Sequence, residues 1–312
     1  MLSAMRKKFD LKAMMNDLTS KSSVLYELSE EDKSSLKKCL LEMYRDVNSV
    51  CLKYDLDLIG SGGTALGSHR HHGFIPWDDD MDFNMARSDC EKLKEIFEDE
   101  LGDKYLLSCP NYKNKPTARF YKIYKKGTTF IEIDGGKDYP RNIFIDIFPI
   151  DNVPENKALR TVKGCIAHAI MFIASRVQTY ETKNNDMIIY RSATKESLKM
   201  YKLELLIGRL FSFMSFEQWV NFLDKYLAKT KKSADCNVPT GRKHYFGSIK
   251  RWDDFFPVSH GDFEGLDIKL PNNIHKYLTG LYGKSYMQIP PVDKREKHFV
   301  LDFDTNHAPH KE

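Results

Sequence analysis

The chain has 312 residues, enough for one large core that carries an insertion, and its 41% hydrophobic and 12% aromatic residues exclude global disorder. Its 48 Lys and Arg against 44 Asp and Glu give a net charge of +4, which is too small an excess for a nucleic-acid-binding protein. Six cysteines without a Cys-x-x-Cys pair disfavour a disulfide framework or a zinc knuckle and favour reduced thiols in a cytoplasmic protein.

Membrane segments are not expected. Residues 1–20 are charged and lack the long apolar centre of a secretory signal, and no stretch reaches the roughly 18 uninterrupted apolar residues of a membrane span. The longest apolar run, from Cys165 to Ala174, contains His168 and has a basic residue near each end. We interpret it as a core helix, with a helix lying on a membrane surface as the alternative.

The first predicted elements lead to a glycine-rich turn. After a polar arm, Ser29 with Asp32 three residues on is a capping signal, and a helix is expected where apolar residues recur at helical spacing, at Leu36, Leu40, Met43, Val47 and Val50. A strand over residues 56–59 then delivers the turn Gly60-Ser-Gly-Gly-Thr-Ala-Leu-Gly67. Glycines there let backbone N–H groups approach an anion, so Gly62, Gly63 and Thr64, with Arg70 beside them, are candidate phosphate ligands.

A dense acidic cluster follows in Arg70-His-His-Gly-Phe-Ile-Pro-Trp-Asp-Asp-Asp-Met-Asp82. The alternation Asp80-Met81-Asp82-Phe83 predicts a strand with Asp80 and Asp82 on one face. Two adjacent carboxylates resist ionisation unless a cation lies between them, and the hard cations Mg²⁺ and Mn²⁺ prefer such oxygens. Together with a phosphate cradle, the pattern indicates phosphoryl or nucleotidyl transfer. A solvated acidic turn is the structural alternative.

Further elements alternate along the chain. A helix is expected over residues 89–101, a hairpin from strands 118–124 and 128–133 joined at 125–127, and a buried strand over 142–148. Asp146 in that strand needs a partner, which is either a lysine or a metal ion shared with Asp80 and Asp82. Asp151, after Pro149, is expected in a cap or loop.

From residue 154 to 235 the pattern becomes helical and basic, which predicts a helical insertion. A loop-rich stretch over 237–256 and a short helix over 274–282 follow, and residues 263–271 between them resemble a hairpin of a known protein family. Docking of the basic insertion on anionic lipid is an alternative to a merely solvated face. His69, His71 and His72 are too tightly spaced in a loop, without an evident fourth ligand, for a zinc site.

Several of these segments together resemble the LicD family. The family signature is matched by Gly63 to Gly67, by Arg70 to Asp82 and by Asp146-Ile-Phe-Pro-Ile-Asp151, and its C-terminal pattern is similar to Leu278 through His298. The resemblance implies an α+β fold of the nucleotidyltransferase-like (DNA polymerase β) superfamily, with a mixed sheet flanked by helices. The expected division is an N-terminal arm (1–35), a core (36–153), the helical insertion (154–236) and a C-terminal part of the core with a tail (237–312).

The resemblance also assigns candidate residues. It implies that Asp80, Asp82 and Asp146 are the catalytic carboxylates and hold Mg²⁺ or Mn²⁺. It matches His71 and Lys122 as contacts of phosphate or its surroundings, with a solvated lysine as the alternative for Lys122. Arg295 and His298, behind Pro290-Pro291, are either substrate contacts or tail-docking residues. A choline group would need aromatic faces, for which the sequence offers Tyr121, Tyr124, Tyr245, Phe246 and Trp252 without selecting among them.

The leading hypothesis is a metal-dependent phosphotransferase that moves phosphocholine from CDP-choline to a hydroxyl of a cell-surface glycan or teichoic acid precursor. Its partners are then a CDP-linked donor and a glycan or lipid-linked glycan acceptor, in the cytoplasm or at the inner face of the membrane. The alternatives are transfer of ribitol or glycerol phosphate, and true nucleotidyl transfer from CTP. A glycan-binding protein with a degenerate site is disfavoured by the intact carboxylates.

Overall fold

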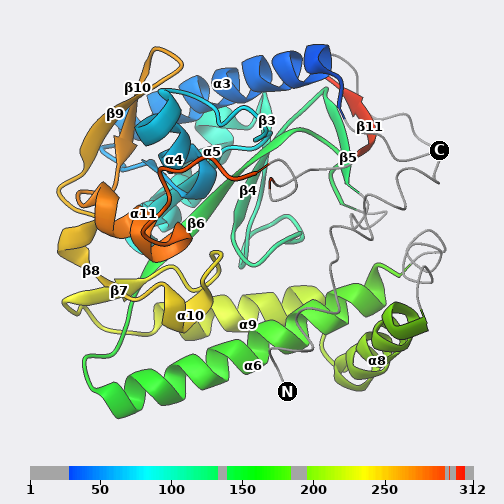
Figure 1. Ribbon diagram of the computed structural model, residues 1–312. Coiled ribbons are helices and arrows are strands. Elements are labelled where there is room, and N and C mark those ends of the chain that lie inside the picture. The colour runs from blue at the N-terminus through cyan, green and yellow to red at the C-terminus, as the bar shows by residue number, and fades with distance from the viewer. Residues whose placement is uncertain (1–27, 133–138, 184–194, 292–294, 296–299, 306–312) are drawn as a thin grey trace.

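A mixed sheet dominates the computed structural model, which describes residues 28–132, 139–183, 195–291, 295 and 300–305. Among these residues nine strands form one sheet with the order β3-β4-β6-β2-β1-β10-β9, to which β7 is joined through β6, and β8 through β7 (Figure 1). The strands are β1 (Ile59–Gly60), β2 (Asp82–Ala86), β3 (Tyr105–Ser108), β4 (Tyr121–Lys125), β6 (Phe144–Asn152), β7 (Asp235–Asn237), β8 (Lys250–Arg251), β9 (Ser259–Phe263) and β10 (Leu266–Leu270). The predicted mixed sheet flanked by helices is confirmed.

Two helices, α3 (Glu30–Lys53) and α5 (Arg87–Leu101), pack on the sheet and on each other. The capping box at the start of α3 is present, because the Ser29 side chain accepts from Asp32 N and the Asp32 side chain accepts from Ser29 N. The apolar residues that predicted α3 are buried in the main core, together with Leu93 and Phe97 of α5. Local signals were sufficient for both helices.

At the edge of the sheet farthest from β3, β9 and β10 form the predicted hairpin. Its turn residues Glu264 and Gly265 both have positive φ, 54° and 76°, as a two-residue type I′ turn requires. The predicted helix over 274–282 is α11 (Ile274–Tyr282), which contacts α4 (Gly62–His71). The short helix η1 (Trp252–Asp254) contacts α11, whereas the short helix α10 (His244–Gly247) contacts α6 (Lys157–Glu181).

The predicted helical insertion contains α6 (Lys157–Glu181), α8 (Lys195–Phe211) and α9 (Phe216–Ala228), which lie together below the sheet in Figure 1. They build a second hydrophobic cluster, in which Ala167, Ile170 and Ala174 of α6 pack with Val220 and Leu223 of α9. The exact domain boundaries stay a prediction.

A buried ionic cluster joins this layer to the sheet. Arg87, at the start of α5, donates from Nε and Nη2 to the two carboxylate oxygens of Asp151, both at 2.8 Å, and from Nη1 to Asp224 of α9. Asn111 Nδ2 donates to the other oxygen of Asp224 at 2.8 Å. Asp151 therefore lies in strand β6 as an ion-pair partner, and its expected place in a cap or loop was wrong.

Three local expectations were also wrong. The strands expected to form a hairpin do not pair with each other: β4 pairs with β3 and β6, whereas β5 (Thr129–Glu132) pairs with β11 (Val300–Asp304) in a separate sheet. The strand predicted to carry both Asp80 and Asp82 is β2, which begins at Asp82, so Asp80 precedes it. The glycine turn is in fact the first turn of α4, and His69 and His71 lie in its last turn rather than in a loop.

Candidate active site

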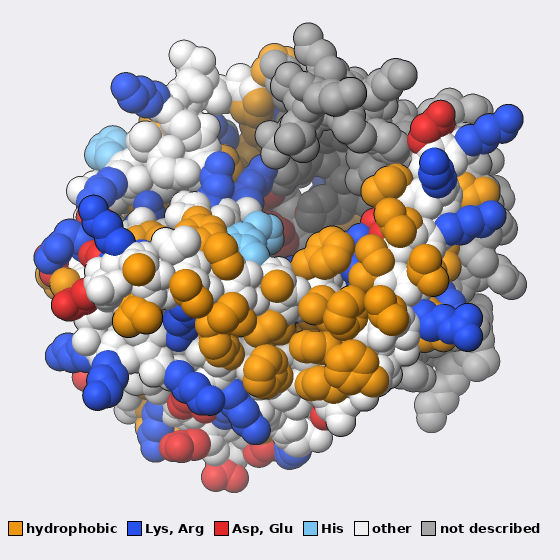
Figure 2. Space-filling view, turned by 90° about the horizontal axis from the view of Figure 1, so that it is seen from below, with side chains coloured by type: hydrophobic (Ala, Val, Ile, Leu, Met, Phe, Trp, Pro, Cys, Tyr) orange, Lys and Arg blue, Asp and Glu red, His pale blue; other side chains and the backbone are white. Residues whose placement is uncertain are grey.

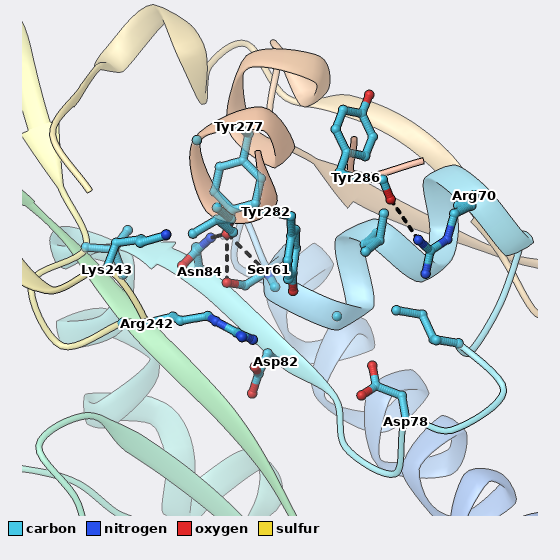
Figure 3. A pocket seen from close by; sticks show the side chains of 18 of the residues that line it. Ser61, Arg70, Asp78, Asp82, Asn84, Arg242, Lys243, Tyr277, Tyr282 and Tyr286 are labelled. Atoms are coloured by element: carbon cyan, nitrogen blue, oxygen red, sulfur yellow. Dashed lines mark hydrogen bonds between the residues drawn. The ribbon is translucent and has the colours of Figure 1, made fainter. Parts of the chain in front are cut away.

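A cavity of about 750 Å³ opens beside β2 and the N-terminus of α4 (Figure 3). Its walls come from segments far apart in the sequence: the start of α4, the residues before β2, the loop after β7, and α11 with the chain that follows it. The polar residues that line it include Ser61, Arg70, Asp78, Asp80, Asp82, Asn84, Arg242, Lys243 and Lys250. A pocket of roughly 300–1,000 Å³ is the usual size for a drug-sized ligand.

The first turn of α4 is held by a buried tyrosine. The hydroxyl of Tyr277 accepts hydrogen bonds from Gly62 N at 3.3 Å and Asn84 Nδ2 at 2.9 Å, and it lies 2.9 Å from Ser61 Oγ. Burial raises the pKa of Tyr277. The N–H of Gly62 is thus engaged by the protein, while the positive end of the helix still faces the cavity.

Carboxylates lie directly against this helix end, which explains its glycines. A Cβ on Gly62, whose φ is +50°, would stand 3.3 Å from Asp82 Oδ2, and one on Gly63 would meet Asp78 Oδ2 at 2.2 Å. Thr64 is buried, and its Oγ1 accepts a hydrogen bond from the backbone N of Asp82 at 2.8 Å. Gly62 and Gly63 therefore line the cavity, whereas Thr64 fixes the start of β2 from behind.

Sheet register brings the second predicted carboxylate beside the first. Asp82 of β2 is opposite Asp146 of β6, and Asp146 is opposite Lys122 of β4. Lys122 Nζ lies 2.9 Å from Asp146 Oδ1 and donates to Oδ2 at 3.2 Å, so the lysine alternative for Asp146 is present. Burial raises the pKa of Asp146 although Lys122 opposes the shift. Burial, and then the charges of Asp80, Asp146 and Asp78, raise the pKa of Asp82 well above its usual range.

A smaller cavity of about 120 Å³ lies on the Lys122 side. It is lined by Asp79, Asp80, Lys122, Phe144 and Asp146 among others, so Asp80 borders both cavities. Lys122 Nζ is 3.2 Å from the centroid of the Phe144 ring. Predicted site residues thus divide between the two cavities, with Asp82 in the larger one and Asp146 in the smaller one.

The carboxylate oxygens suit a hard cation such as Mg²⁺, and the raised pKa of Asp82 shows that its charge is poorly compensated by the protein. Asp80 and Asp82 fit such an ion best, since Asp146 already carries the ammonium of Lys122. Within the described ranges, no three His, Cys, Asp or Glu side chains form a ready set of metal ligands. A cation bound by Asp80 and Asp82 would therefore need further ligands that these side chains do not supply.

Basic residues face the carboxylates from the loop that follows β7. Arg242 points toward Asp82 in Figure 3, and Lys243 extends into the same cavity. The guanidinium of Arg242 lies 5.5 Å from the centroid of the Tyr282 ring. Neither residue was predicted from the sequence. A Gly-Arg-Lys run in a loop-rich stretch was the available signal, but it is too common to select.

The remaining predicted residues lie around the far wall. Arg70 lines the cavity and donates to the carbonyl oxygens of Tyr286 at 2.7 Å and Gln288 at 3.3 Å, so it also anchors the segment after α11. Its Nε donates to Nδ1 of His71 at 3.2 Å, and burial followed by Arg70 lowers the pKa of His71.

Arg295 rests on Trp77, with its guanidinium carbon 4.4 Å from the ring centroid, and donates from Nε to Pro290 O at 3.2 Å. This contact matches the tail-docking interpretation and places Arg295 beside the cavity-lining Trp77. His298 lies outside the described residues.

The aromatic candidates for choline do not line this cavity. Tyr121, Tyr124 and Tyr245 are buried elsewhere, and Phe246 and Trp252 lie outside its walls. The aromatic lining is instead Trp77, Phe148, Phe255, Tyr277, Tyr282 and Tyr286. Sequence composition offered too many aromatic residues to identify these.

Comparison with known proteins finds a match between residues 58–172 and the model of the LicD/FKTN/FKRP nucleotidyltransferase domain. The chain is 25% identical over 262 residues to the lipopolysaccharide cholinephosphotransferase LicD of Haemophilus influenzae, which covers 82% of this chain and 91% of that protein. It is 28% identical over 120 residues to an uncharacterised protein of Rickettsia prowazekii, covering 36% of this chain and 44% of that protein. The matched domain includes α4, β2, β4 and β6, which carry the glycines and the carboxylates.

Proposed function

The chain carries a nucleotidyltransferase domain of the LicD family, and from this premise we propose that it transfers phosphocholine from CDP-choline to a hydroxyl of a cell-surface glycan or teichoic acid precursor. The same premise supports a nucleotidyltransferase-like fold for the mixed sheet. It also supports a cytoplasmic site of action, where CDP-linked donors are made.

One arrangement carries the proposal: the N-terminus of α4, the carboxylate of Asp82 and the basic side chain of Arg242 meet in one cavity of about 750 Å³. A CDP-linked donor needs cationic and N–H groups for its diphosphate. The helix end and Arg242 supply these on opposite sides of Asp82. Of the aromatic side chains in the lining, Trp77, Phe148 and Tyr282 are partly exposed and offer faces to a quaternary ammonium group.

In this proposal each residue has a role in positioning or in charge. Arg242 and Lys243 bind the phosphate oxygens on which negative charge develops, and such contacts supply most of the catalysis in phosphoryl transfer. Asp80 and Asp82 would hold Mg²⁺ or Mn²⁺, which when bound neutralises the diphosphate and lowers the pKa of the attacking hydroxyl. Tyr277 keeps Gly62 and Asn84 in place around the donor.

The acceptor hydroxyl approaches from the side of the smaller cavity, because Asp80 borders both spaces. Asp80 is then positioned to accept the hydroxyl proton as the oxygen attacks phosphorus and CMP leaves. Lys122 holds the Asp146 carboxylate beside this path. Asp146 joins the metal ligands only if this ion pair separates.

The test is release of CMP from CDP-choline by the purified protein with Mg²⁺ and candidate glycan acceptors, with chelated enzyme as the control. We expect metal-dependent CMP release. Release of CMP from CDP-ribitol or CDP-glycerol but not from CDP-choline would show that a group other than phosphocholine is transferred, while the proposed mechanism would stand. Pyrophosphate release from CTP and a phosphorylated alcohol would replace it with nucleotidyl transfer.

A further inference from the structure

Large apolar side chains are exposed along one side of the helical insertion. On α6 they are Leu159, Val162, Ile166 and Phe172, and on α8 and just beyond it they are Met200, Leu203, Leu206, Leu210 and Phe213. On α6, Leu159, Val162 and Ile166 recur every three or four residues and form one helical stripe, with Phe172 to one side of it, and the set on α8 recurs in the same way. Leu210 is 70% exposed and Phe213 72% exposed, values unusual for such residues. We call this set, with Phe222 of α9, the apolar face.

The apolar face is continuous. Helices α6 and α8 touch closely where a Cβ on Gly208 would lie 2.2 Å from the carbonyl oxygen of Arg176. Phe213 meets Trp219 at 5.7 Å between ring centroids, and Trp219 meets Phe222 at 6.5 Å, which connects α8 to α9. Figure 2 shows the result as a broad hydrophobic band on the face seen from below, with Lys and Arg along its edges.

Helix α6 is long and apolar enough to cross a membrane by length and composition, the one such helix in the part of the chain that is described. Its other side, however, is packed into the second hydrophobic cluster against α9 and Tyr245. A helix held in this way presents one stripe outward, so a membrane would meet it lengthwise at the surface rather than around its circumference.

The charge of the helical insertion indicates what kind of surface binds the apolar face. Residues 155–235 hold 14 Lys and Arg against 8 Asp and Glu, a net charge of +6, whereas the rest of the chain carries −2. Many of these basic side chains are exposed around the helices, including Lys157, Lys195, Lys199, Lys202, Arg209, Lys225 and Lys229. Two copies of such a face would repel each other, while anionic lipid head groups attract it, by about 1 kcal/mol for each Lys or Arg near the surface.

We propose that the apolar face docks on an anionic lipid bilayer, with α6 and α8 lying in the interface and their lysines and arginines on the head groups. The proposal rests on the exposure and charge of the insertion. It does not depend on which group the active site transfers.

The experiment is flotation of the full chain with vesicles of phosphatidylglycerol and, separately, of phosphatidylcholine. We expect flotation with phosphatidylglycerol that weakens as salt is added, and little with phosphatidylcholine. The variant Leu210→Asp/Phe213→Asp should lower the partition coefficient at least about tenfold. Both side chains are exposed, so its melting temperature should match that of the wild type.

Leu52→Asp is the matched control, because Leu52 is 60% exposed but lies on α3, and it should float like the wild type. Equal flotation of Leu210→Asp/Phe213→Asp and wild type would overturn the proposal, as would wild-type protein that stays in the dense fraction. A wild-type dimer in sedimentation that becomes monomeric in this variant, without flotation, would assign the face to a second copy instead. All these readouts are independent of CMP release.

Discussion

Asp82 is a carboxylate whose position is costly for the folded chain and useful for the proposed reaction. It lies at the first residue of β2, close to Gly62 and beside three other acids whose charges raise its pKa after burial has done so. In the metal-free protein, burial and these neighbouring charges therefore disfavour the ionised form of Asp82. Such a group is expected where a cation or a positively charged substrate complex normally supplies the missing charge.

The variant Asp82→Asn tests this balance. Turnover should fall on the order of a thousandfold, since an amide is a weak ligand for a hard cation. In chelator, however, its melting temperature should rise above that of the wild type, because the substitution removes the repulsion and leaves the backbone bond to Thr64 intact. Asp253→Asn, at a side chain 82% exposed, should change neither quantity. An inactive Asp82→Asn that melts below the wild type would indicate a structural role.

Arg242 allows a second test at the same scale. If its guanidinium binds the donor diphosphate, Arg242→Ala should lower kcat/KM for CMP release on the order of a hundredfold. Arg242→Lys should recover only part, because lysine loses the bidentate geometry. Glycan-independent binding of CDP-choline, measured by calorimetry, should weaken in parallel. An unchanged affinity of Arg242→Ala for CDP-choline would show that Arg242 does not bind the phosphate groups.

At the scale of elements, the joint between β2 and α5 fixes three segments at once. Arg87 bridges Asp151 of β6 and Asp224 of α9, and the three side chains are 16%, 3% and 9% exposed. Removing one member of a buried ion pair leaves the others uncompensated, which costs about 3–5 kcal/mol. The sequence shows no pattern for this cluster, because its members come from strands and helices that meet only in the fold.

Arg87→Ala should therefore lower the free energy of unfolding, measured by urea denaturation, by about 3–5 kcal/mol. Lys92→Ala on the same helix is the control, since its pair with Glu95 spans 3.5 Å on the surface and should contribute less than about 1 kcal/mol. Equal losses in the two variants would show that the cluster does not hold the layers together.

Elements with local signals were predicted well, and those chosen by distant partners were not. Three features depend only on residues that are close together in the sequence: the capping box of α3, the positive-φ turn between β9 and β10, and the apolar spacing of α11. The turn at residues 125–127 is equally local, but β5 pairs with β11 from the other end of the chain. The carboxylates followed from the motif, whereas Asp78, Arg242 and Tyr277 depended on which segments line the cavity.

For the whole molecule, three histidines make the free energy of unfolding sensitive to acid. Burial and neighbouring positive groups lower the pKa of His69, His71 and His244 below its usual value; for His244 the neighbours are Arg119 and His168. The unfolded chain then binds more protons below about pH 6.5 than the folded one. Stability contributed by the neutral rings is present above that pH and is lost as the pH falls through it.

These histidines should consequently lower the melting temperature as the pH falls from about 7 to 5.5, while the raised pKa values of Asp82 and Asp146 act in the opposite direction. His244→Asn should make this fall shallower, and asparagine tolerates the positive φ of 51° at this position. An unaltered slope in His244→Asn would assign the acid response to other groups.

The ionic cluster at Arg87 also limits which helical insertions from related proteins this chain could accept in a chimaera. The insertion enters and leaves the sheet between β6 and β7 and so has the connections of an exchangeable module, yet its α9 carries Asp224, while Arg87 begins α5 directly after β2 and Asp151 belongs to β6. A chimaera that imports helices without an acid at this position leaves one arm of Arg87 buried without its counter-charge, five residues from Asp82. The helical insertion should therefore be exchangeable only together with an acid that pairs with Arg87.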